Sequence, residues 1–215
     1  MLIYAADKSQ FVQHVRGNQI DERIQENMEM AGLGGVSPSE VASWRHSMQY
    51  MKNVLEDSPI PDDAGVAIEY QIPQTAKRVD FILTGRNPED RDTAVIVELK
   101  PWESVEATAK DAIGEPFLGG AVREVAHPSY QAWTYAALLE DFNEAVEQDA
   151  IRLHPCAYLH NCVSPEVKSG FYGEHLQRAP AFLKEDAVLV RRRGYDGVDI
   201  CFGRVTRDGY GSADT

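Results

Sequence analysis

The sequence predicts an α/β protein with a mixed central sheet flanked by helices. Helical patterns dominate residues 1–62, and three apolar strand-like segments follow at 65–72, 77–84 and 93–100. A long helical pattern then precedes a fourth strand-like segment at 151–161. Consecutive short strands tend to pair, and helices cover the faces of the resulting sheet. We therefore expect a three-strand meander that is extended by the later strand.

The composition suits a compact protein with one main domain. The chain has 215 residues, of which 43% are hydrophobic, so it can bury a sizeable core. Its cysteines, Cys156, Cys162 and Cys201, are too few and too scattered for a disulfide framework, which favours a reducing cytoplasm. The N-terminus does not resemble a secretory signal, and no apolar run is long enough to cross a membrane. We expect a cytoplasmic protein without membrane contact.

The net charge of −13 argues against one class of function. Proteins that bind nucleic acid through a broad positive surface neutralise phosphates with Lys and Arg, whereas this chain is acidic. An acidic metal site is still compatible with nucleic acid, because bound cations can reverse the local field.

Residues 1–62 are expected to form a helical region packed on the core. Helical patterns cover residues 7–30, and glycines follow each run. Ser37 and Glu40 match a capping box, with Pro38 in the first helical position. The apolar residues that follow recur at spacings of three and four, which predicts one buried helix face. They are Val41, Trp44, Met48, Met51 and Leu55.

Residues 63–187 are expected to form the core of the fold, and residues 188–215 a divergent tail. The loop “GRNPEDRD” between the segments at 77–84 and 93–100 contains Gly, Asn, Pro and Asp. A short loop of this composition predicts an antiparallel hairpin.

The remaining segments are assigned from weaker patterns, with one exception. Residues 102–114 predict a short helix, and residues 115–127 a loop. Residues 128–148 carry the strongest helical pattern in the chain, and Pro128 stands at its start. A further helical pattern covers residues 169–190.

Three charged residues lie inside the apolar strand segments. Side chains alternate between the faces of a strand, so Glu98 and Lys100 share one face. Hairpin pairing would bring Asp80 to the same end of the sheet. Two nearby carboxylates make a hard oxygen site that suits Mg²⁺ or Mn²⁺, and a lysine beside them can stabilise charge on a phosphate. The alternative is a structural ion pair between Lys100 and either carboxylate.

A second Glu-x-Lys triplet shows that this spacing alone is not specific. Glu166 and Lys168 have the same form, but they lie outside the strand segments, and no strand-borne Asp precedes them. We interpret them as surface charge. The informative pattern is an Asp on one strand, Glu-x-Lys on the next strand, and a helix afterwards.

Asp80 followed by “VELK” resembles the PD-(D/E)xK nuclease superfamily. Val79 stands where the superfamily pattern has proline, which is a frequent departure. The segment “YQAWTY” places Gln131 and Tyr135 on one helix face, and this is similar to the Gln-x-x-x-Tyr element of the RecB-like branch. An ordinary amphipathic helix is the alternative for that pair. The resemblance implies a restriction-endonuclease-like fold.

A wider resemblance covers roughly residues 1–185. The stretches “DDAGVAIEYQIPQTAKRVDFILTG”, “IVELKPWE”, “HPSYQAWTYAALLEDFNEAV” and “PCAYLHN” are similar to the N-terminal nuclease domain of bacterial nuclease–helicase fusions with a Schlafen-group-3-like helicase half. This implies hydrolysis of DNA or RNA in phage defence or nucleic-acid processing, together with a helicase partner. The sequence has no Gly-x-x-x-x-Gly-Lys-Ser/Thr phosphate loop, so ATP hydrolysis is not expected. The oligomeric state stays open.

The resemblance also implies roles for individual residues. Asp80 and Glu98 would be metal ligands for Mg²⁺ or Mn²⁺, with the Leu99 carbonyl as a third ligand. Lys100 would be the catalytic lysine. The accessory residues that it implies are Gln131 and Tyr135.

Three further residues are candidates whose alternatives stay open. Glu69, on the preceding strand segment, is an additional candidate metal ligand, and the alternative is an ion pair with Lys77 or Arg78. His127 and Tyr130 lie at the start of the long helix and are candidates for a phosphate contact. The alternative for both is helix capping or packing.

Two other functions are weighed against a nuclease. One is a catalytically silent module that docks a helicase or binds nucleic acid, which the acidic charge favours. The other is a zinc site in “HPCAYLHNC”, where four candidate ligands alternate. They are His154, Cys156, His160 and Cys162. Ligands strung along one strand spread too far to surround one ion, so a half-buried strand is the better account.

Overall fold

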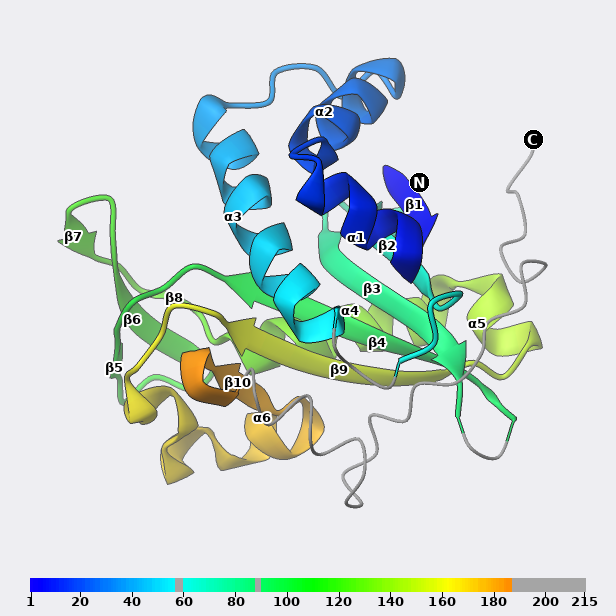
Figure 1. The fold of residues 1–215 in the computed structure, drawn as a ribbon. Coiled ribbons are helices and arrows are strands. Elements are labelled where there is room, and N and C mark those ends of the chain that lie inside the picture. The colour runs from blue at the N-terminus through cyan, green and yellow to red at the C-terminus, as the bar shows by residue number, and fades with distance from the viewer. Residues whose placement is uncertain (57–59, 88–89, 187–215) are drawn as a thin grey trace.

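The computed structural model describes residues 1–56, 60–87 and 90–186 (Figure 1). Its α-helices are α1 (Lys8–Arg16), α2 (Ile20–Met30), α3 (Pro38–Leu55), α4 (Pro128–Phe142), α5 (Glu144–Gln148) and α6 (Gly173–Arg178). Its strands are β1 (Tyr4–Asp7), β2 (Gly65–Gln71), β3 (Arg78–Arg86), β4 (Asp92–Lys100), β5 (Val105–Ala107), β6 (Ile113–Leu118), β7 (Ala121–Val122), β8 (Val125–Ala126), β9 (Arg152–Leu159) and β10 (Ala181–Leu183). Short 3₁₀ helices lie at Pro165–Lys168, Gly170–Tyr172 and Lys184–Asp186. The expected tail at 188–215 lies outside the described residues.

The main sheet has six strands in the order β1-β2-β3-β4-β9-β10. Its first three neighbouring pairs are antiparallel, whereas β9 pairs in parallel with both β4 and β10. The predicted α/β fold with a mixed sheet is therefore confirmed. The three-strand meander and its extension by the later strand are confirmed as well.

Helices cover both faces of this sheet. Figure 1 shows α1, α2 and α3 gathered over one face, with α4 on the other. The strand side chains alternate accordingly. Phe81 and Leu83 pack with the N-terminal helices, while Ile82 and Ile96 pack with Tyr135 and other residues of α4. The alternating apolar pattern of β3 and β4 is what lets one sheet serve two cores.

Helix α3 begins as the capping pattern predicts. Ser37 lies before its first residue, and its side chain accepts a hydrogen bond from the Glu40 backbone N–H at 3.2 Å. The apolar stripe of α3 is also confirmed, because Trp44 and Met48 are buried in the core. The reciprocal half of the capping box is absent among the described contacts, because the Glu40 carboxylate accepts a hydrogen bond from Arg78 instead.

The short helix expected at residues 102–114 is wrong. This region and the expected loop after it form a second, small sheet in which β6 pairs with β5, β7 and β8. A lone helix of this length is marginal in water, whereas pairing lets Trp102 and Val105 bury themselves against Val167. Gly119 and Gly120 have φ values of +59° and +86° in the β6–β7 turn, a conformation that suits glycine.

Three other boundaries differ from expectation. The strand β1 pairs with the edge of β2 and was not predicted, because its four residues are too short for a pattern. The long helix ends at Phe142, where Asn143 caps the separate helix α5. The helical pattern over 169–190 corresponds to the short helix α6, which lies between two 3₁₀ turns and is followed by β10. The last residues of the pattern lie outside the described part of the chain.

No helix in the described residues combines the length and apolar content that a membrane crossing requires.

A buried histidine links α3 to the end of β9. His160 is completely buried, its Nε2 lies 3.1 Å from the Ser47 Oγ, and its ring stacks on Tyr50 at 4.3 Å. Burial lowers the pKa of His160 from its ordinary value of 6.5 to about 4. Between these two values the unfolded chain takes up a proton that the folded chain does not, so stability falls as the pH drops.

We expect wild type to lose about 2 kcal/mol more unfolding free energy than His160→Gln between pH 7 and pH 4.5. Glutamine can keep a hydrogen bond to Ser47 without a titrating ring. Urea unfolding of both proteins at the two pH values measures the difference. Parallel pH dependence in the two proteins would show that His160 protonates as easily in the folded state as in the unfolded state.

Candidate active site

The candidate site lies where β3 and β4 separate. The two strands pair from Arg86 opposite Asp92 to Phe81 opposite Val97. Beyond this point a side chain replaces the backbone ladder, because the Asp80 carboxylate accepts a hydrogen bond from the Leu99 N–H at 2.8 Å. A fork therefore opens between the strands at the residues that the sequence singles out.

The strand β2 changes direction beside the same fork. Glu69 has a φ of +55°, and it is skipped in the β2–β3 ladder between Ile68 and Tyr70. Ile68 packs with the N-terminal helices, whereas Tyr70 packs on the α4 side, so the strand switches faces at Glu69. A left-handed conformation at a non-glycine residue costs about 1–3 kcal/mol and is often found at functional sites.

Three carboxylates thus lie in a row across three neighbouring strands: Glu69 on β2, Asp80 on β3 and Glu98 on β4. Burial and the Asp80 charge raise the pKa of Glu69 to about 7, although Arg78 and Trp44 lower it. Burial and the Asp80 charge likewise raise the pKa of Glu98. Burial also raises the pKa of Asp80, against the opposing effects of Lys100 and the Leu99 N–H. Keeping these three groups charged is therefore costly, mainly because they are buried.

Glu98 and Lys100 point to the same side of β4, as the strand alternation predicts. Lys100 Nζ donates to Glu98 Oε1 at 2.5 Å. The other oxygen, Oε2, is buried and receives no hydrogen bond from any residue that the structure describes. Burial lowers the pKa of Lys100, but the Glu98 and Asp80 charges outweigh it and the net pKa is raised. Lys100 is therefore a charged ammonium, and it forms a hydrogen bond with only one of the two carboxylate oxygens of Glu98.

Both oxygens of Glu69 are occupied by neighbouring residues. Trp44 Nε1 donates to Oε1 at 2.8 Å, and Arg78 Nη1 forms an ion pair with Oε2 at 3.3 Å. The ion pair with Arg78 is one of the alternatives expected for this residue. Glu69 forms this ion pair and is at the same time close to Asp80. The hypothesis that Glu69 is a metal ligand depends on that proximity.

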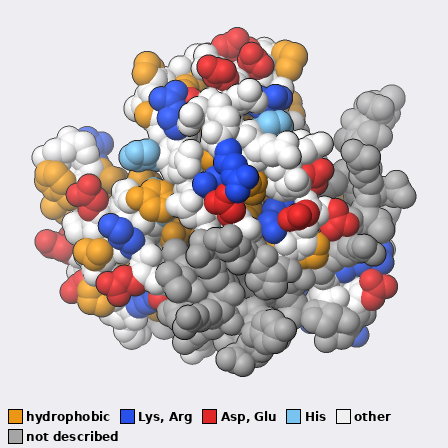
Figure 2. Space-filling view, in the orientation of Figure 1, with side chains coloured by type: hydrophobic (Ala, Val, Ile, Leu, Met, Phe, Trp, Pro, Cys, Tyr) orange, Lys and Arg blue, Asp and Glu red, His pale blue; other side chains and the backbone are white. Residues whose placement is uncertain are grey.

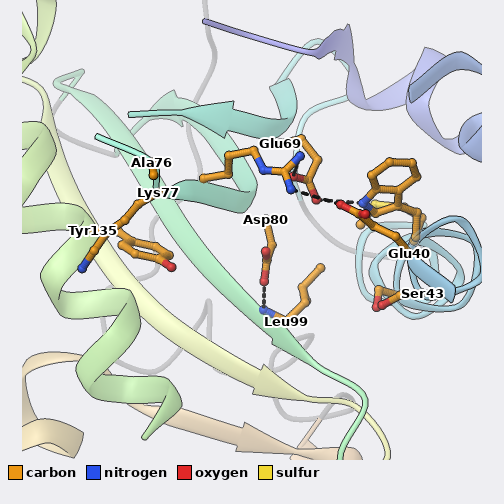
Figure 3. Close-up of a pocket in the computed structure, with 12 residues that line it drawn as sticks. Glu40, Ser43, Glu69, Ala76, Lys77, Asp80, Leu99 and Tyr135 are labelled. Atoms are coloured by element: carbon orange, nitrogen blue, oxygen red, sulfur yellow. Dashed lines mark hydrogen bonds and ion pairs between the residues drawn. The ribbon is translucent and has the colours of Figure 1, made fainter. Parts of the chain in front are cut away.

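A pocket of about 400 Å³ opens beside the fork. Figure 3 shows Asp80 near its centre, with Glu40 and Ser43 from α3 on one side and Lys77 and Tyr135 on the other. Other residues that line it are Trp44, Ser47, Met48, Glu69, Ala76, Arg78 and Leu99. The pocket thus joins α3, the meander and α4 around Asp80, whereas Glu98 and Lys100 are not among its lining residues.

The helix α4 contributes the Gln-x-x-x-Tyr pair. Gln131 Nε2 donates to Tyr135 Oη at 2.8 Å. Burial and then the Glu98 charge raise the pKa of Tyr135, which places this phenol within the electrostatic reach of the carboxylates. Lys77 Nζ lies over the same ring at 5.6 Å from its centre. The structure therefore brings Tyr135 into the pocket wall and holds it through Gln131.

The other two candidates of this helix lie elsewhere. His127 is completely buried, accepts a hydrogen bond from the Ser129 N–H, and stacks on Tyr172. Capping and packing, the expected alternative, account for its place. Tyr130 contacts the rings of Trp133 and His175 and does not line the pocket.

The donor set fits a hard divalent cation, although it is small. No group of three or more His, Cys, Asp or Glu side chains in the described residues is arranged to hold a metal. Mg²⁺, however, commonly uses only one or two protein carboxylates and keeps several waters. Asp80 and Glu98 supply two carboxylates, and the partnerless Oε2 of Glu98 is a buried acceptor that a cation would satisfy.

The alternating His and Cys residues do not form a metal cluster within the described residues. Cys156 is buried in the core beside Tyr158, and His160 is bonded to Ser47. Cys162 is buried in a separate cluster around Trp102. The strand interpretation of this segment is confirmed by β9.

The surface agrees with the acidic composition. On the face in Figure 2, Lys and Arg side chains are interspersed with Asp and Glu, and those of the described residues do not gather into one broad basic patch. Any nucleic acid at the pocket would depend on a few local cations.

The sequence reasoning missed the contribution of α3. Glu40 and Trp44 line the pocket, and both reach Arg78 or Glu69. Arg78 carried a usable signal, because it stands two residues before Asp80 in an otherwise apolar strand, just as Lys100 follows Glu98. Nothing in the local pattern of α3 marked its polar side chains as part of a site.

Comparisons of the chain with protein-family models, with curated proteins and with solved structures find no match.

Proposed function

We propose that the protein is a metal-dependent phosphodiesterase that cleaves nucleic acid. The observation that carries the proposal is the meeting of Asp80, Glu98 and Lys100 at a fork in the sheet, beside an open pocket. Burial raises the pKa of both carboxyls, and the Asp80 charge adds to this at Glu98. One buried oxygen of Glu98 accepts no hydrogen bond from the described residues, and a cation beside it would stabilise the charged form of both groups. The adjacent pocket offers room for the substrate.

Asp80 and Glu98 are the residues that would hold Mg²⁺ or Mn²⁺. When bound, such an ion lowers the pKa of a water molecule and stabilises charge on a phosphate. The Leu99 carbonyl stays a candidate third ligand. The Leu99 N–H has a separate task, because it fixes the Asp80 carboxylate in the fork.

The side chains around the carboxylates have distinct roles in this proposal. The Lys100 ammonium stabilises negative charge that develops on the phosphate and is oriented by Glu98. Tyr135 bounds the pocket on the α4 side and is oriented by Gln131. Glu69 belongs to the carboxylate row and is also bonded to α3, so it connects the site to the helical layer.

The acidic charge bears on the partners of the enzyme. A net charge of −13 gives little general attraction for a polyanion. A helicase that delivers a strand to the pocket would remove this limitation, in line with the expected role in phage defence or nucleic-acid processing. The same charge is the reason to keep a silent docking module as the second candidate.

A cleavage assay tests the proposal directly. We expect the purified protein to cut labelled DNA or RNA, single-stranded or duplex, with Mg²⁺ or Mn²⁺ and not with EDTA. Restoration of activity when metal is added back would show that chelation did not simply denature the protein.

The opposite outcome is also informative. Absence of metal-dependent cleavage on all four substrates with either ion would contradict the enzyme. Retained binding of an uncut strand, or of a helicase, would then favour the docking module.

A further inference from the structure

We propose that Arg78 binds a phosphate of the substrate strand, and that Glu40 occupies this position until the strand arrives. This deepens the proposed function and rests on it, because it assigns the pocket a recognition residue for nucleic acid. It makes Arg78 a substrate-binding residue that acts beside the carboxylate row.

The first observation is the position of Arg78. It lies two residues before Asp80 on β3, and both residues line the same pocket. The pocket is also lined by the carboxylates of Glu40 and Glu69. A polyanion that enters this acidic space needs a local cation, and Lys77 and Arg78 are the cations among the described lining residues. Arg78 is the one that presents a guanidinium.

The second observation is that the two nitrogens of the Arg78 guanidinium are held unequally. Nη1 has two partners on the inner side: it donates to Met28 Sδ at 3.6 Å and forms an ion pair at 3.3 Å with Glu69, whose side chain is 10% exposed. Nη2 donates to Glu40, whose side chain is 36% exposed, at 3.0 Å. An ion pair that is about one third exposed contributes little stability, whereas a buried carboxylate keeps its partner. The Glu69 side therefore anchors the guanidinium, and the Glu40 side is easily exchanged.

The third observation is chemical. A phosphate can replace a carboxylate as the acceptor of a guanidinium N–H, because both present anionic oxygens to it. Glu40 accepts from Nη2 through one oxygen, Oε1. Glu40 thus stands in for a phosphate oxygen at the mouth of the pocket. Exchange of one acceptor for the other leaves the Arg78–Glu69 pair intact, so the strand is recognised without unfolding the site.

The position of Glu40 adds a consequence for α3. Glu40 lies in the first turn of that helix, and its backbone N–H is bonded to the Ser37 cap. The cap holds the helix start while the side chain is free to leave Arg78. Release of Glu40 therefore changes a surface contact and not the helical layer.

Binding measured without metal tests this assignment separately from cleavage. The probe is a fluorescein-labelled twelve-nucleotide single strand, and its anisotropy is followed in EDTA for wild type, Arg78→Gln, Arg78→Lys, Glu40→Gln and the double variant. Arg45→Gln is the matched control. Arg45 also pairs with a buried carboxylate, that of Asp21, but it does not line the pocket.

We expect Arg78→Gln to weaken binding about tenfold and to flatten the dependence of log affinity on log salt by about 0.7. Arg78→Lys, which keeps the charge but loses the fork, should fall between wild type and Arg78→Gln. Glu40→Gln should tighten binding about two- to fivefold, because the competitor for Arg78 is removed. This gain should vanish in the double variant.

The inference is overturned if Arg78→Gln loses no more affinity than Arg45→Gln. It is equally overturned if Glu40→Gln leaves affinity unchanged, or if its gain persists without Arg78, since the effect would then be general charge. Glu40→Gln keeps every partner of Glu69, so this arm remains decisive if Arg78→Gln folds poorly. If wild type cleaves the strand and Arg78→Gln binds it with unaltered affinity, only the role of Arg78 is contradicted. If binding depends on Arg78 but no cleavage occurs, only the proposed enzymatic activity is contradicted.

Discussion

Lys100→Ala should lower the rate of metal-dependent cleavage by roughly a hundred- to a thousandfold while the fold is retained. Removal of one preorganised group that stabilises charge in the transition state typically has this effect. Lys100 is well placed for it, because its ammonium is 2.5 Å from Glu98 Oε1, is only 19% exposed and lies within the field of Asp80. Initial rates on a labelled oligonucleotide measure the loss of cleavage, and circular dichroism with a melting curve shows whether the fold is retained.

The chain contains its own control for this experiment. Lys168 stands in a second Glu-x-Lys triplet, in the 3₁₀ helix Pro165–Lys168, and pairs with Asp186 away from the pocket. Lys168→Ala should therefore change the rate less than twofold. Equal rates in wild type and Lys100→Ala would remove the catalytic lysine from the proposal. An equal loss in both variants would point to a general effect of charge.

The second large effect is expected in stability and not in rate. A ligand that binds only the folded chain at a hundred times its dissociation constant adds about 2.7 kcal/mol. For a chain of this size that corresponds to a rise of about 5–10 °C in melting temperature. Mn²⁺ should produce such a rise in wild type, because it would neutralise the carboxylate row and satisfy the buried Glu98 Oε2. Differential scanning fluorimetry with and without Mn²⁺ measures it.

Two variants show which carboxylates bind the metal. Glu98→Gln should abolish the rise, since an amide is neutral and is a poor ligand for a hard cation. Glu69→Gln distinguishes the two roles considered for Glu69, because its oxygens already accept from Trp44 and pair with Arg78. A retained rise assigns Glu69 to the protein scaffold, and a lost rise assigns it to the metal. Persistence of the full rise in Glu98→Gln would contradict a metal at this site.

Much of the meander could be predicted because its signals are local. The hairpin of β3 and β4 follows from two apolar runs and a turn-rich loop, and its register places Phe81 opposite Val97. The shared face of Glu98 and Lys100 follows from the two-residue period of a strand. The Gln131–Tyr135 contact follows in the same way from the four-residue spacing of a helix.

Other parts of the fold had no comparable local signal. The small sheet of β5 to β8 replaces an expected helix, since strand pairing and the burial of Trp102 outweigh a weak helical pattern. The fork between β3 and β4 was also not predicted from the hairpin pattern. A regular hairpin would continue its ladder through Asp80, whereas here the Asp80 side chain takes over the bond to the Leu99 N–H.

The sequence by itself determined four strands of the main sheet, β2, β3, β4 and β9, and which charges share a local face, because both depend on residue spacing within a few positions. It therefore brought Asp80, Glu98 and Lys100 together as one candidate site. Only the tertiary structure decided what surrounds them. The Trp44–Glu69 and Glu40–Arg78 contacts join residues that are far apart in the chain, and such contacts arise from the packing of α3 on the sheet.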